Sequence, residues 1–209
     1  DGRPMQVGHF ALLVDIGELE ELRLSSFGDD EIRLGALTRH REILGSEALR
    51  KSLPLLPEAV AHVAHVGIRN RGTLGGSLAY ADPAAELPAC SVALDATLVI
   101  GGLAGEREVK ASRFFTGLFE TDLRKGELIL AVKFPVPRQK RAVAFAELAR
   151  RHGDFAIAGV AAVAAVEQDC IEDARFVYFG CVDRAKVAER VSAAATGLKL
   201  PAAVTGALE

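Results

Sequence analysis

The sequence predicts a globular fold of mixed helices and strands, and three observations lead to this expectation. Half of the 209 residues are apolar, which is enough to build a sizeable core. Short apolar runs that flank glycine turns predict β-hairpins around residues 28–30 and around Gly101 and Gly102. Apolar residues at helical spacing over residues 58–67 predict a helix that ends at Gly67.

The amino-terminal part reads as strands followed by a short helix. Residues 12–16 form a strand-like run, and residues 22–34 predict the two strands of the first hairpin. We expect Thr38 to cap a short helix after them. The first residue is Asp1 rather than methionine and the strand-like run follows closely, so we expect the chain to be a truncated piece.

Residues 68–88 carry the most informative motif, with three glycines in five residues. Gly72, Gly75 and Gly76 have no Cβ, so the backbone there can adopt a positive φ and converge its N–H groups on an anion. The segment fits either an anion cradle or a structural turn. It is neither a Walker loop nor a dinucleotide-binding G-x-G-x-x-G loop.

The residues around this motif suggest how it is positioned. We expect a short extended piece over residues 77–81, with Asp82 as the N-cap and Pro83 as the first residue of the next helix. The preceding Arg69 and Arg71 fit either ligand contacts or solvated side chains.

Histidine and cysteine usage predicts no metal centre. His62 and His65 lie three apart on the expected helix, and without a third ligand we favour packing or surface roles over a metal site. The three cysteines are scattered, which supports neither a zinc site nor an iron–sulfur cluster. Their odd number and the absence of a hydrophobic signal region favour a reducing, cytoplasmic location.

The middle of the chain predicts more sheet. Residues 94–100 and 107–109 read as a hairpin, and residues 127–134 read as a buried strand closed by Pro135 and Pro137. Four large apolar side chains between them lie at helical spacing, so we expect them to pack in the core. They are Phe114, Phe115, Leu118 and Phe119.

The two prolines and the charged residues 138–141 mark the expected domain boundary. We therefore predict one domain over residues 1–137 and a partial second domain over residues 138–209. The second contains an alanine and valine run, a turn at residues 168–169, a strand over residues 174–179 and one helix after Asp183.

Charge and hydropathy exclude two classes of protein. The net charge of −3 and the pI near 6.0 argue against a nucleic-acid-binding protein, which would gather a basic excess on one face. The longest apolar stretch, residues 155–166, falls well short of the roughly 20 residues that span a bilayer. We therefore expect no nucleic-acid partner and no membrane span.

Four segments together resemble the FAD-binding medium subunit of molybdenum hydroxylases, a family that includes carbon monoxide dehydrogenase and the flavin domain of xanthine dehydrogenase. They read LLVDI, GIRNRGTLGGSLAYADPAAELP, ELILAVKFPVP and LARRHGDFAIAGVAA. The resemblance covers most of the chain, from about Leu12 to Asp183, and its motifs are specific as a set.

The resemblance implies an α+β fold with a PCMH-type FAD-binding domain, the type shared by this group of flavoproteins. A small carboxy-terminal domain follows, with a three-stranded antiparallel sheet on helices. The implied function is electron transfer: iron–sulfur clusters of a 2Fe-2S small subunit pass electrons through FAD to an external acceptor. The resemblance also implies that substrate is oxidised at a molybdenum-cofactor large subunit and that the three chains form a heterotrimer, either single or dimerised. No catalytic side chain and no metal ligand is expected in this chain.

The resemblance also assigns cofactor-binding residues. The loop around Gly72 matches the family loop that holds the FAD pyrophosphate through N–H groups and a hydroxyl; it comprises Gly72, Thr73, Leu74, Gly75, Gly76 and Ser77. Glu86 matches an acidic contact, Ile129 an apolar position beside the flavin, and Phe155 an aromatic that stacks on the isoalloxazine. Gly75→Val is expected to abolish FAD retention and to leave the fold largely intact.

The chain departs from the family pattern at two points. It lacks the amino-terminal subdomain whose A-G-G-x-[ST] loop makes the other half of the pyrophosphate grip. Glu147 also stands where some members carry a lysine, and an anion near phosphates would be unfavourable.

Several alternatives stay open beside the resemblance. Asp154 fits a turn as well as a flavin contact, and Glu86 fits the first turn of a helix, where the dipole favours a carboxylate. The alternative functions are a stand-alone PCMH-type flavoenzyme, such as a cell-wall precursor reductase, and a flavin-free scaffold or fragment of the same fold.

Overall fold

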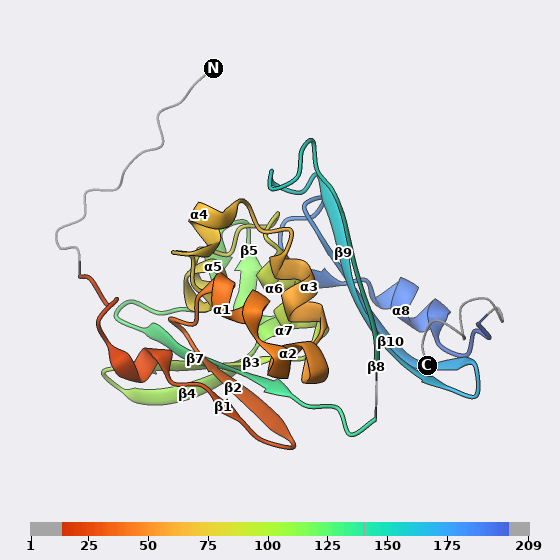
Figure 1. Cartoon of the computed structure of the whole chain (residues 1–209), viewed down its shortest axis with the longest axis horizontal. Coiled ribbons are helices and arrows are strands. Elements are labelled where there is room, and N and C mark those ends of the chain that lie inside the picture. The colour runs from red at the N-terminus through yellow and green to blue at the C-terminus, as the bar shows by residue number, and fades with distance from the viewer. Residues whose placement is uncertain (1–13, 140, 201–209) are drawn as a thin grey trace.

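The structure is a computed structural model that describes residues 14–139 and 141–200 (Figure 1). Two larger antiparallel sheets, a small two-stranded sheet and short helices make up this part of the chain. The first sheet has the strand order β1-β2-β7-β3-β4. Its strands are β1 (Ser26–Phe27), β2 (Glu31–Gly35), β7 (Leu128–Pro135), β3 (Thr97–Gly102) and β4 (Gly105–Lys110). This mixed arrangement confirms the α+β class.

The predicted hairpins and the predicted buried strand are present in this sheet. Phe27 pairs with Ile32 across the first hairpin, and Leu98 lies between Val109 and Val132 in the second. Strand β7 occupies the centre because its residues alternate between a buried face and a half-buried face. The second turn was predicted at Gly101 and Gly102, which instead belong to β3.

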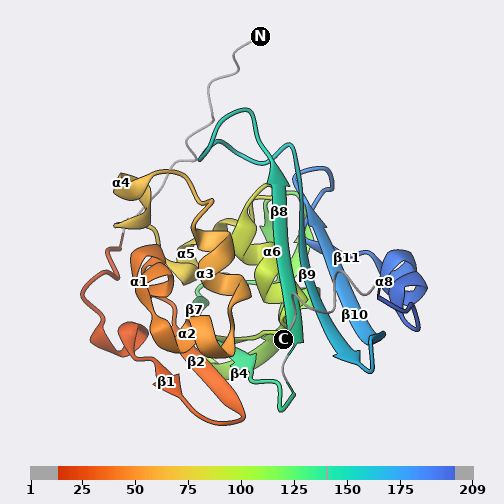
Figure 2. The same cartoon turned by 45° about the vertical axis from the view of Figure 1, so that its right-hand side comes forward.

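Seven short helices follow the first hairpin and cover one face of this sheet (Figures 1 and 2). They are α1 (His40–Gly45), α2 (Glu47–Ser52), α3 (Leu55–Val60), α4 (Val66–Arg69), α5 (Leu74–Tyr80), α6 (Glu86–Ala93) and α7 (Ala111–Phe114). All eight residues of α6 are buried, because the helix packs against α3 on one side and against the second sheet on another.

The second sheet has the order β11-β10-β9-β8 and packs on α6 and α3. Its strands are β8 (Arg141–Leu148), β9 (Ala158–Glu167), β10 (Cys170–Phe179) and β11 (Lys186–Val187), and α8 (Glu189–Ala195) follows them. The predicted turn at Gln168 and Asp169 is confirmed, since both residues have a positive φ. The expected three-stranded sheet is wrong by one strand, because β11 pairs with the outer edge of β10.

The helix predicted over residues 58–67 is interrupted. Helix α3 ends at Val60, and Ala64 adopts a positive φ of 39° before α4 begins. The Arg69 guanidinium donates hydrogen bonds to the carbonyls of Val63 and Ala64, at 2.7 and 2.8 Å, so these carbonyls have a partner outside a helix. Thr38 is likewise not a cap, because Arg39 is the N-cap residue of α1.

The extended piece predicted over residues 77–81 is helical. Thr73 is the N-cap of α5, and its Oγ1 accepts a hydrogen bond from the Gly76 N–H at 3.1 Å. Asp82 does not cap a helix, because its Oδ1 accepts from the Ala84 N–H within a turn. Helix α6 begins later, at Glu86.

The predicted four-residue apolar face is half correct. Phe114 and Phe115 are buried, but Leu118 and Phe119 are 59% and 49% exposed. The chain leaves α7 after four residues and forms a small hairpin of β5 (Phe115–Gly117) and β6 (Glu120–Thr121), which places the last two side chains outside the core. The first two residues of the strand predicted at residues 12–16 lie outside the described residues, and residues 14–16, which are described, form no strand.

The glycine segment is held against the chain that follows β2. The N–H groups of Leu74 and Gly75 donate to the carbonyls of Thr38 and Ala36, both at 2.8 Å. A Cβ added to Gly75 would lie 2.6 Å from the Cβ of Ala36 and 2.9 Å from its carbonyl oxygen. Glycine is therefore favoured here by packing, so a side chain at this position strains the fold as well as the loop.

We predict that Gly75→Val destabilises the chain by about 1–3 kcal/mol, because the added side chain must push Ala36 and the β2 end apart. Urea unfolding of both proteins measures this difference. The matched control is Gly45→Ala, since a Cβ at Gly45 meets no heavy atom within 4 Å. Equal unfolding midpoints for Gly75→Val and the original chain would contradict the packing role.

Candidate functional site

The predicted FAD loop divides into a buried part and an accessible part. Leu74 and Gly75 are buried, and their N–H groups are bonded to carbonyls of the preceding segment. Gly76 is exposed, and Thr73 and Ser77 are half-buried at the start of α5. The hydroxyls of Thr73 and Ser77 and the exposed backbone at Gly76 can contact a ligand. The buried Leu74 and Gly75 hold these groups in position.

The sequence analysis did not identify His40, a buried residue of α1 that contacts this loop. Its Nε2 lies 3.1 Å from both the Thr73 carbonyl oxygen and the Ser77 Oγ. Burial lowers the pKa of His40, a bond to the Thr73 carbonyl opposes this, and the Arg69 charge lowers it further. A Cβ at Gly72 would lie 2.7 Å from His40 Cε1, so this glycine is also a packing requirement.

No signal in the sequence pointed to His40, because it is a lone histidine far from the glycine motif. The neutral imidazole, favoured by the lowered pKa, donates from Nε2 to the Thr73 carbonyl oxygen. It thereby orients the hydroxyl-bearing turn of Thr73 and Ser77.

A second wall of the site is the loop over residues 149–157, between β8 and β9. Gly153 has a φ of +85°, and a Cβ there would lie 2.6 Å from the carbonyl oxygen of Ala64. Only glycine allows this loop to lie so close to the segment between α3 and α4. Figure 2 shows the loop at the same end of the molecule as α4.

A cavity of about 280 Å³ lies where this loop meets the α3 to α4 connection. It is lined by His62, Glu147, Ala149, Arg150, Arg151 and His152. His62 also packs at a tilt on the Phe145 ring, 5.1 Å between centroids. These contacts favour the packing interpretation of His62, and no cluster of three metal-ligating side chains occurs among the described residues.

Two carboxylates approach each other at this end of α6. Glu86 is only 9% exposed. Burial raises its pKa to about 7, a bond to its own N–H opposes the rise, and the charges of Glu147 and Asp82 add to it. The Oε1 of Glu147 lies 3.3 Å from His62 Nδ1. Near neutral pH, Glu86 can therefore hold a proton and donate a hydrogen bond.

The two remaining predicted contacts differ in exposure. Phe155 is 74% exposed on the β8 to β9 loop, so its ring is available for stacking. Ile129 is 5% exposed in β7 and belongs to the core. Asp154 donates its N–H to the Arg151 carbonyl at 3.1 Å, which fits the turn interpretation.

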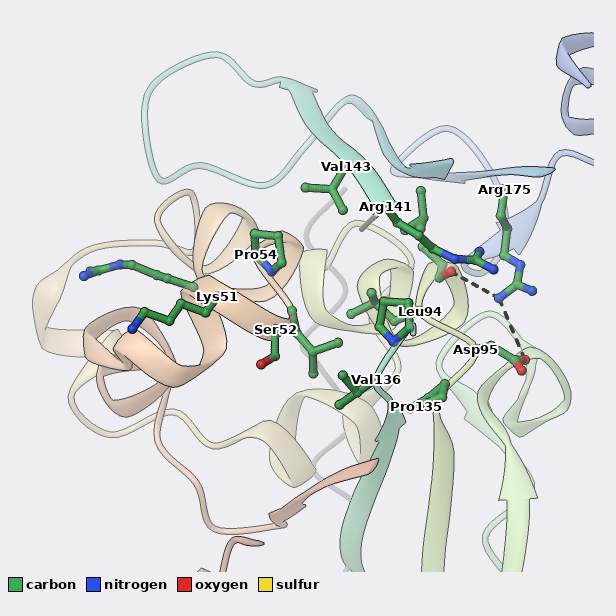
Figure 3. A pocket seen from close by; sticks show the side chains of 15 residues that line it. Lys51, Ser52, Pro54, Leu94, Asp95, Pro135, Val136, Arg141, Val143 and Arg175 are labelled. Carbon is green, nitrogen blue, oxygen red and sulfur yellow. Dashed lines mark hydrogen bonds and ion pairs between the residues drawn. The ribbon is translucent and has the colours of Figure 1, made fainter. Parts of the chain in front are cut away.

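A larger cavity of about 580 Å³ lies at the other end of α6 (Figure 3). Arg175 spans its edge, with Nη1 bonded to the Ala93 carbonyl at 3.1 Å and 3.8 Å from Asp95 Oδ1. Ala93, the last residue of α6, lines this cavity, roughly 10 Å along the helix from Glu86 at its start. None of the predicted site residues lines the larger one.

The family is shown by comparison with known proteins. Residues 4–137 match the family described as the FAD binding domain in molybdopterin dehydrogenase. Residues 143–208 match the CO dehydrogenase flavoprotein C-terminal domain. The chain therefore belongs to the FAD-binding subunits of the molybdenum hydroxylases, an FAD-dependent oxidoreductase family, and the resemblance noted from its sequence is confirmed.

Individual relatives agree with this assignment. The chain is 43% identical to the 6-hydroxypseudooxynicotine dehydrogenase complex subunit alpha of Paenarthrobacter nicotinovorans, over 76% of this chain and 53% of that protein. It is 36% identical to the glyceraldehyde dehydrogenase medium chain of Sulfolobus acidocaldarius, over 90% and 66%. A structure of carbon monoxide dehydrogenase from Hydrogenophaga pseudoflava superposes with a TM-score of 0.84 at 32% identity, over 90% and 66%.

The chain spans about half to two thirds of the length of these relatives. Within the described residues, no helix combines the length and the apolar character needed to cross a membrane.

We predict that Glu86 makes stability fall as the pH rises. Its folded pKa of about 7 exceeds the ordinary value of 4.5, so between these values the folded chain binds more protons than the unfolded chain. Glu86→Gln should remove this loss and be more stable than the original chain at pH 8, by on the order of 3 kcal/mol. Urea unfolding at pH 5 and pH 8 measures both proteins, and parallel pH profiles would contradict the prediction.

Proposed function

We propose that this chain binds FAD between the start of α5 and the β8 to β9 loop and serves as an electron-transfer subunit. The observation that carries the proposal is the close approach of the β8 to β9 loop to Ala64, between α3 and α4: a Cβ at Gly153 would lie 2.6 Å from the Ala64 carbonyl oxygen, which also accepts a hydrogen bond from Arg69. This contact brings the loop that bears Phe155 to the segment that leads into the glycine motif.

The residues present fit the chemical parts of FAD. The start of α5 offers the Thr73 and Ser77 hydroxyls and the positive end of a short helix to the pyrophosphate. The exposed Phe155 ring offers a stacking surface to the isoalloxazine. Bound FAD would supply the electron-transfer chemistry, and the protein would bind and orient it. Among the predicted contacts, Leu74 and Gly75 act through packing, and Ile129 is part of the core.

We further propose that the chain works within a larger complex in the cytoplasm. Relatives are named as a complex subunit or a medium chain, which supports a multi-subunit assembly. In it, a 2Fe-2S small subunit would deliver electrons that a molybdenum-cofactor large subunit takes from the substrate. The assembly would be a heterotrimer, and the residues 1–137 and 138–209 would act as its FAD-binding and carboxy-terminal domains.

The first test is whether the purified 209-residue chain binds FAD. We expect quenching of FAD fluorescence on titration and a yellow protein after gel filtration. A chain that stays colourless with excess FAD would refute the binding proposal. Co-purification from the native host of larger and smaller chains that carry molybdenum and iron would support the complex, and isolation as a single chain would favour a stand-alone flavoenzyme.

We predict that Phe155→Ala weakens FAD binding by about 0.5–1.5 kcal/mol through loss of stacking, without lowering the unfolding temperature. The side chain is 74% exposed, so its removal leaves the core intact. FAD titration and thermal unfolding measure the two effects. Leu103→Ala is the matched control, because Leu103 is fully exposed on the β3 to β4 turn. Equal affinities for FAD in all three proteins would argue against stacking by Phe155.

A further inference from the structure

The carboxylate of Glu147 is buried with one oxygen unused. Its side chain is 4% exposed, and Oε1 lies 3.3 Å from His62 Nδ1. The other oxygen, Oε2, is buried and has no hydrogen-bond partner among the described residues. A buried carboxylate oxygen without a donor is unfavourable, so this atom marks a place where a donor is expected.

The surroundings of Glu147 limit the kind of donor. The nearby carboxylates come from α3 and α6: Glu58, whose Oε1 accepts from the Phe145 N–H at 3.3 Å, and Glu86, whose ionisation Glu147 disfavours. A phosphate ester offers no hydrogen-bond donor to this oxygen, and any attraction of phosphate to the cavity would come from Arg150 and Arg151 in its lining. A bound metal ion is not supported, because the described residues contain no suitable cluster.

Glu147 lies beside a cavity although its own side chain is buried. It lines the 280 Å³ cavity, together with Ala149, Arg150, Arg151 and His152 of the loop that bears Phe155. His62, which lines the same cavity, holds the carboxylate through Oε1. The carboxylate is thereby fixed in position, with Oε2 buried at the wall of the cavity and unpaired within the described part of the chain.

We propose that Glu147 is a cofactor-orienting residue whose Oε2 accepts a hydrogen bond from an N–H group on one of the two ring systems of FAD. The inference rests on the proposed function. FAD offers this chemistry at the imide N–H of the isoalloxazine and at the amino group of adenine. The charges of the site would then set the orientation of FAD. Its phosphates would bind at the start of α5, and a neutral ring that carries a hydrogen-bond donor would bind at Glu147.

The test compares the 209-residue chain with Glu147→Gln, which keeps the shape and removes the charge. We expect the variant to bind FAD about tenfold more weakly, because hydrogen bonds to charged groups are the stronger ones. Its unfolding temperature should be equal or higher, because the substitution removes a like charge near Glu86. The matched control is Glu172→Gln, which changes an exposed carboxylate on β10 of the same sheet.

Titrations with riboflavin and with ADP distinguish the two donors. Weaker binding of riboflavin with unchanged binding of ADP assigns the donor to the isoalloxazine imide, and the reverse assigns it to adenine. Equal FAD affinities of Glu147→Gln and the original chain would overturn the inference and leave the proposed function intact. A lower unfolding temperature with unchanged FAD affinity would show a purely structural role, and failure of both proteins to bind FAD would overturn the inference and the function together.

Discussion

The docking of the glycine segment onto the chain after β2 is the contact on which the site depends. Three backbone hydrogen bonds join the two segments, from Leu74 and Gly75 to the carbonyls of Thr38 and Ala36, and from His40 to the carbonyl of Gly72. The segments lie so close that a Cβ at Gly72 would overlap His40 and a Cβ at Gly75 would overlap Ala36. These contacts fix the start of α5 in one position. A binding loop that is held in place before its ligand arrives is preorganised.

Helix α6 connects the two halves of the molecule through its packing. It is buried along its whole length between the first group of helices and the second sheet, so both halves of the chain share one core. Its first residue, Glu86, is consequently held in an environment that raises its pKa and that also contains Glu147 from β8. The site combines side chains from both halves because this helix fixes their relative position.

Sequence reasoning succeeded where the local pattern and the tertiary structure agree. The two hairpins, the central strand β7 and the turn at residues 168–169 follow from alternation and turn residues, which act over a few positions. The sequence-based prediction failed over residues 58–86, where the ends of short helices are set by contacts with other parts of the chain. Arg69 holds the carbonyls between α3 and α4, and Thr73 starts a helix in a stretch rich in glycine.

The family, its cofactor and the α+β class could be read from the residues alone, because motif strings and periodicity are properties of the linear chain. The arrangement of the site could not, because it depends on contacts between distant segments. His40 supports Thr73 from 33 positions away, and Gly153 meets Ala64 across the two halves of the chain. The glycine motif suggested a binding loop, but only the packing shows that Gly72 and Gly75 lie close against neighbouring segments while Thr73, Gly76 and Ser77 remain exposed or half-buried.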